Sequence, residues 1–104
     1  MAAHSAPGRG ARLPDAVPLE ISHVTRLSWE LGTRVVDDEE ATLHSQWQQE
    51  DTFWELDVFQ VTHHTDLLRI QTPVGREQFY GVTQSELESA LTTLEAADRW
   101  QQSD

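Results

Sequence analysis

The chain has 104 residues, no cysteine, and 18 acidic against seven basic side chains, for a formal net charge of −11. The absence of cysteine excludes disulfides, zinc–thiolate sites and thiol catalysis, and it favours a reducing compartment, so we expect a cytoplasmic protein. No stretch reaches the ~20 apolar residues of a membrane span, and no apolar secretory signal opens the sequence, so we expect no membrane contact.

Residues 1–17 are rich in Ala, Gly, Pro and Arg and show no hydrophobic period. This composition predicts a disordered tail, followed by a single domain over 18–100. The length fits one hydrophobic core, with little room for an enclosed active site.

The segment 18–36 fits two templates. A helical stripe at spacings of three and four is formed by Ile21, Val24, Leu27, Leu31 and Val35. The alternation of Leu27, Trp29 and Leu31, with nearby β-branched residues, instead indicates a half-buried strand. We favour the strand, with Gly32 breaking it near its end.

The middle of the chain has the pattern of a β-meander. Its predicted strands cover 42–48, 52–62, 67–72 and 78–82, separated by turn residues. Apolar side chains alternate onto both faces of 52–62, which is typical of a central strand covered on both sides. The Pro-Val-Gly-Arg segment at 73–76 has the chemistry of a tight turn.

The last element is predicted to be a helix over about 84–100. Thr83 and Glu86 have the spacing of a capping box, and an apolar stripe runs through Leu87, Leu91 and Leu94. Residues 101–104 are expected to be a disordered end. The fold class is therefore α+β: a three- to five-stranded antiparallel meander with one C-terminal helix packed on one face.

His63, His64 and Asp66 are the best candidates for a metal or acid–base site. Adjacent residues of a strand point to opposite faces, so both histidines reach one metal only from a turn. One loop supplies too few ligands for a closed zinc site, which needs four. We interpret the segment as a polar turn and expect no metal and no cofactor.

Catalytic motifs are missing from the sequence. There is no Gly-x-Ser-x-Gly elbow and no glycine-rich phosphate loop. The abundant carboxylates follow from composition and specify no catalytic pair. We therefore expect no enzymatic activity.

The tryptophans and acids suggest a contact surface instead, because tryptophan is enriched at interface hot spots. Trp29 and Trp47 have polar neighbours and are expected to be partly exposed. The candidate interaction residues are Trp29, Asp37, Asp38, Glu39, Glu40, Trp47, Glu50 and Asp51.

Charge indicates the kind of partner. A body this acidic repels phosphate, so direct nucleic-acid binding is not expected. The acidic body suits a basic protein partner, so we expect the chain to act as an interaction module. The most specific version of this hypothesis is an inhibitor or a nucleic-acid-mimicking antagonist.

A structural homo-oligomer is the main alternative. One helix leaves the other face of the sheet bare, and a second copy could cover it in a homodimer. An unrecognised small enzyme or metal-binding protein is the third hypothesis.

Overall fold

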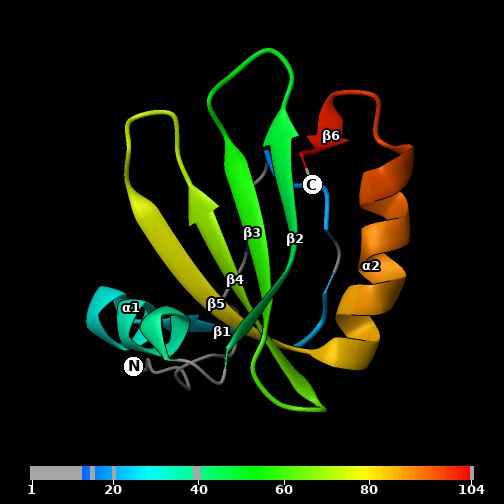
Figure 1. Ribbon diagram of the computed structural model, residues 1–104. Helices are drawn as coiled ribbons and strands as arrows, with labels where there is room; N and C mark the ends of the chain where they lie inside the picture. Colours follow the sequence, from blue (N-terminus) through cyan, green and yellow to red (C-terminus); the bar gives the residue numbers. More distant parts are fainter. Residues whose placement is uncertain (1–12, 15, 20, 39–40, 104) are drawn as a thin grey trace, which may run out of the picture.

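The computed structural model describes residues 13–14, 16–19, 21–38 and 41–103 of the chain (Figure 1). Over these residues it has six strands and two helices. In chain order they are β1 (Val24–Leu27), α1 (Trp29–Asp37), β2 (Thr42–Gln49), β3 (Glu55–Gln60), β4 (Thr65–Gln71), β5 (Glu77–Thr83), α2 (Gln84–Ala96) and β6 (Trp100–Gln102).

All described strands belong to one antiparallel sheet in the order β1-β5-β4-β3-β2-β6. The α+β class, the antiparallel meander from β2 to β5 and the helix that follows it are confirmed. The sheet is larger than the three to five strands predicted, because β6 adds an unexpected strand at one edge. At the other edge, β1 lies within the segment 18–36 that was expected to form a strand. None of the described helices is both long and apolar enough to cross a membrane.

The segment 18–36 is not one strand. It holds the short strand β1 and then α1, whose start is fixed by Ser28: the Ser28 hydroxyl accepts a hydrogen bond from the Leu31 N–H at 3.2 Å. Gly32, predicted to break this segment, lies inside α1, where its missing side chain lets the helix approach Phe79 of β5.

The larger core lies between α2 and one face of the sheet. Leu87, Ala90 and Leu94 of α2 pack against alternate residues of the strands. Val17 and Leu19 are buried in the same cluster. The described part of the predicted tail therefore packs on the core, while residues 1–12 and 15 lie outside the described residues.

The opposite face carries a smaller core beneath α1. Phe59, Leu67 and Phe79 are buried there, and Val35 and Val36 of α1 pack against them. The two helices thus lie on opposite sides of the sheet, as Figure 1 shows. Because α1 has only nine residues, it covers only part of its face.

The C-terminal part differs from prediction at both ends of α2. Thr83 is the N-cap, but its hydroxyl donates to Glu86 Oε1 at 3.1 Å and caps no backbone N–H, so the capping box is incomplete. The helix ends at Ala96 instead of 100. Trp100 then opens β6, where its indole N–H donates to the Ala16 carbonyl at 3.2 Å, so Gln101 and Gln102 are edge-strand residues.

Candidate functional site

A row of polar side chains crosses the face that α1 leaves partly open. The strand registers place Glu77 opposite Gln71, Gln71 opposite Glu55, Glu55 opposite Gln48, and Gln48 opposite Gln101. Residues directly opposite each other share a face, so these five form a single line, which we call the polar row. All five are at least partly exposed. With neighbouring strands about 4.8 Å apart, the polar row spans about 19 Å.

An ion pair lies beside the polar row on the same face. The Nε and Nη2 atoms of Arg69 donate to Asp57 Oδ2 at 2.8 and 2.6 Å, and the Gln46 amide donates to Asp57 Oδ1 at 3.2 Å. Asp57 is thereby neutralised. Glu55 and Glu77 form no ion pair with any described residue and are the uncompensated charges of the polar row.

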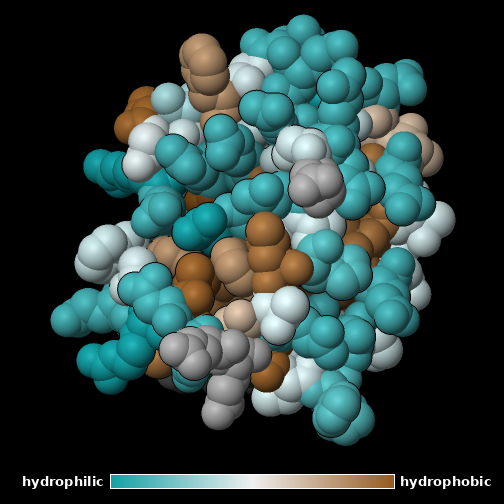
Figure 2. All heavy atoms as spheres, in the orientation of Figure 1, coloured by the Kyte–Doolittle hydropathy of each residue, from teal (hydrophilic) through white to brown (hydrophobic). Residues whose placement is uncertain are grey.

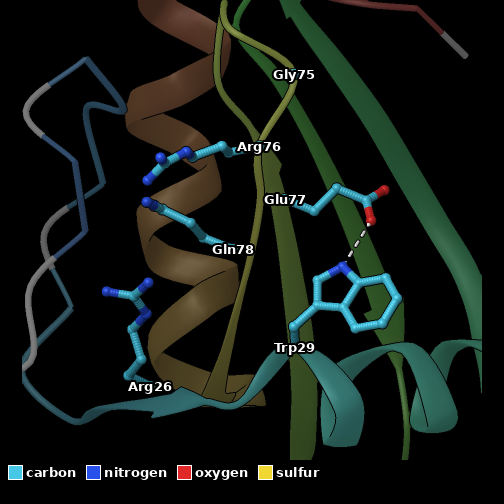
Figure 3. A pocket seen from close by; sticks show the side chains of 6 residues that line it. All are labelled: Arg26, Trp29, Gly75, Arg76, Glu77 and Gln78. Atoms are coloured by element: carbon cyan, nitrogen blue, oxygen red, sulfur yellow. Dashed lines mark hydrogen bonds between the residues drawn. The ribbon is translucent and has the colours of Figure 1, made fainter.

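An exposed aromatic ring lies at one end of the polar row. Trp29, the first residue of α1, is 60% exposed, and its indole N–H donates to Glu77 Oε1 at 3.3 Å (Figure 3). The hydrogen bond holds the carboxylate next to the ring. An aromatic ring attracts a guanidinium or ammonium group, and a neighbouring carboxylate adds a charge-assisted partner. The pair has the chemistry that recognises an arginine or lysine side chain.

The loop between β2 and β3 adjoins the other end of the polar row. Glu50 Oε2 accepts a hydrogen bond from the Gln101 amide at 3.3 Å, and Asp51 pairs with Arg99 at 3.4 Å. Phe53 in the same loop is 78% exposed. The sequence predicted a strand over 52–62, which includes Phe53, but β3 begins only at Glu55. Aromatic residues favour strands, so the residue type did not indicate that Phe53 lies in an exposed loop.

Trp47 does not belong to this surface. It was expected to be partly exposed, but it is 4% exposed and faces the α2 core, where its indole N–H donates to Ser45 at 3.0 Å. A β-bulge between Leu43 and Ser45 shifts the alternation of β2. It turns Leu43 to the open face and leaves Ser45 and Trp47 inside.

The predicted run of acids is also separate from the polar row. Asp37 ends α1 and Asp38 is its C-cap, so both lie at the opposite end of the helix from Trp29, about 13 Å along its axis. Glu39 and Glu40 lie outside the described residues. Of the predicted contact residues, the structure brings Trp29 and Glu50 to the ends of the polar row, with Asp51 next to Glu50.

His63 and His64 are exposed on the turn between β3 and β4, and Asp66 is 5% exposed on the α2 face. The Asp66 Oδ1 atom is buried without a hydrogen-bond partner. Burial raises the pKa of the Asp66 carboxyl above its ordinary value, against the opposing influence of His44 and with a further rise from Glu88. Within the described part of the chain, no three His, Asp or Glu side chains are placed to hold a metal ion.

The chain has no match among protein-family models, curated proteins or solved structures. A functional proposal therefore rests on the surface itself. Hydrophilic side chains cover most of the view in Figure 2, in keeping with the acidic composition.

Proposed function

We propose that this protein is a small acidic interaction module, without catalytic activity, that binds a basic protein partner through the polar row. The observation that supports this most directly is the exposed Trp29 ring held against the Glu77 carboxylate. A basic side chain of the partner stacks on the ring and pairs with the carboxylate.

The rest of the polar row extends the contact. Glu55 lies two strands from Glu77, about 10 Å away, and accepts a second basic group. Gln71, Gln48 and Gln101 present amides that both donate and accept, so they suit a partner backbone or polar side chains. The preferred partner therefore carries two basic groups spaced about 10 Å apart.

The net charge acts before contact is made. A charge of −11 steers a basic protein toward the chain and makes the association rate fall with ionic strength. Where the partner's basic surface is one that binds nucleic acid, the same contacts make the chain an inhibitor or a nucleic-acid-mimicking antagonist.

The test is a titration with a capped hexa-arginine peptide, followed by ¹H–¹⁵N NMR. We expect saturable shifts of the Trp29 indole N–H and of amides along the polar row. Glu77→Gln should weaken binding by about threefold to tenfold, because it removes the carboxylate but keeps the shape.

Glu95→Gln is the matched control, since it removes the same charge from an exposed position of α2 outside the polar row. Its binding should stay within about twofold of the wild type. Equal losses in both variants would mean that the peptide senses net charge alone, and the polar row would lose its role.

A further inference from the structure

A second cluster of polar side chains lies next to the end of β1. Arg26, Arg76 and Gln78 line an open hollow of about 520 Å³, together with Gly75 and the Trp29–Glu77 pair (Figure 3). The ladder between β1 and β5 ends at the pair of Leu27 and Phe79, so the hollow opens where β5 runs on without a neighbouring strand on that side.

The two arginines of this hollow have no acidic partner among the described residues. Of the five arginines in the described part of the chain, Arg69 and Arg99 make ion pairs, whereas Arg26, Arg34 and Arg76 make none. Arg26 is held over the ring of Tyr80, with its guanidinium carbon 5.7 Å from the ring centroid. Two unpaired cations that line one hollow are unexpected on a chain of charge −11.

Gln78 completes a group that only donates hydrogen bonds. Its carbonyl oxygen accepts from the Tyr80 hydroxyl at 3.0 Å, which leaves the amide N–H₂ as the available end. Figure 3 shows Arg26, Gln78 and Arg76 extending to the same side of β5, with Gln78 between the arginines. A guanidinium has five donors and no acceptor, so the cluster offers donors and positive charge together.

Glu77 also lines the hollow, but it makes no ion pair with Arg26 or Arg76. Successive residues of a strand point to opposite faces, so the Glu77 side chain leaves β5 on the other side from Arg76 and Gln78. Its carboxylate is engaged by the Trp29 indole on that side.

We propose that Arg26, Arg76 and Gln78 form a binding site for a doubly charged oxyanion of the phosphate type. Two guanidinium groups match the charge and the several acceptor oxygens of such an anion, and forked Arg–phosphate contacts are among the stronger hydrogen bonds. A carboxylate carries one charge and would leave the second arginine uncompensated. The hollow adjoins the Glu77 end of the polar row, but the proposal rests on Arg26, Arg76 and Gln78 and does not depend on the proposed function.

The experiment is a titration of the full chain with inorganic phosphate at constant ionic strength, followed by ¹H–¹⁵N NMR of backbone amides and arginine Nε–H groups. We expect saturable shifts at Arg26 and over 75–78, with a Kd of about 1 mM. Arg26→Gln combined with Arg76→Gln should weaken binding at least about tenfold.

Arg34→Gln combined with Arg99→Gln is the control, because it makes the same change in net charge at exposed positions outside the hollow. It should keep the phosphate affinity, with both double variants checked for folding by circular dichroism. Shifts that stay linear to about 50 mM phosphate, or equal losses in the two double variants, would overturn the site.

A titration with phenyl phosphate distinguishes a site for a phosphate ester from a site for inorganic phosphate. Tighter binding than inorganic phosphate, with a shift of the Trp29 indole, would mean that the site takes a phosphate ester carrying an aromatic group. Equal binding would mean that it takes phosphate itself. Binding of acetate as tight as that of phosphate would contradict the inferred double charge.

Discussion

The ion pair between Asp57 and Arg69 neutralises two largely buried charges on the sheet face that carries the polar row. The side chains are 11% and 28% exposed, and the Arg69 guanidinium lies over the Phe59 ring. Asp57→Ala would leave a half-buried guanidinium without its counter-charge. We expect a loss of roughly 2–4 kcal/mol in the free energy of unfolding, measured by urea denaturation.

The double variant Asp57→Leu with Arg69→Met serves as the control for this loss. It removes both charges and keeps most of the volume, so it should be clearly more stable than Asp57→Ala. A double variant as unstable as the single one would show that packing, and not the stranded charge, explains the loss.

Asp66 predicts a dependence of stability on pH. Its pKa is raised in the fold, so the folded state holds the proton more tightly than the unfolded chain. The stability associated with this group is present below the unfolded pKa and is lost as pH rises through the folded pKa. Asp66→Asn should therefore gain stability relative to the wild type as the pH rises above the unfolded pKa of Asp66. A difference in urea midpoints that is constant with pH would contradict this.

Single residues also show what sequence alone could predict about the surface. Polar neighbours correctly indicated that Trp29 is exposed, but the same argument was wrong for Trp47. Trp47 pairs with Leu56 and shares its buried face, and polar neighbours in the sequence do not show which face of a strand is covered. The polar row could not be predicted either, because Glu77, Gln71 and Glu55 form a line only once the registers of β5 with β4 and of β4 with β3 are known.

Among the elements, α1 was the main error and α2 the main success. The α2 stripe is long, and its start at Thr83 was correctly predicted. α1 has nine residues, too few for a helical period to outweigh the strand-like alternation around Trp29. The useful signal was Ser28, an N-cap residue followed by Glu30 in the first turn. β6 could not be predicted, because its pairing with β2 depends on tertiary contact.

Gly32 tests how α1 is held on the sheet. A Cβ atom at this position would overlap the ring of Phe79, which is 1% exposed and cannot move freely. Gly32→Ala should therefore cost about 2 kcal/mol of unfolding free energy despite the better helix propensity of alanine.

Gly81→Ala is the matched control, because a Cβ there meets nothing nearer than the Thr25 carbonyl oxygen at 4.0 Å. It should change stability by less than about 0.5 kcal/mol in the same urea experiment. Equal effects of the two substitutions would mean that close approach at Gly32 does not hold α1 in place.

At the scale of the whole molecule, the second helix changes the case for a homodimer. That hypothesis rested on a bare apolar face, whereas Phe59 lies in the cluster under α1 and Val61 packs against it. The uncovered remainder of the face holds the polar row, the Asp57–Arg69 ion pair and the exposed Leu43. Two copies, each of charge −11, would also repel each other on approach.

We therefore expect a monomer of 11.8 kDa in sedimentation equilibrium, at about 50 mM and about 500 mM salt alike. High salt is the stricter condition, because it screens the repulsion and leaves exposed apolar groups such as Leu43 and Phe53 free to associate. A dimer at either salt concentration would contradict the expectation. If Trp29→Ala then dissociated that dimer, the polar row would be a contact between copies of this chain, and binding of a foreign basic protein would have to compete with it.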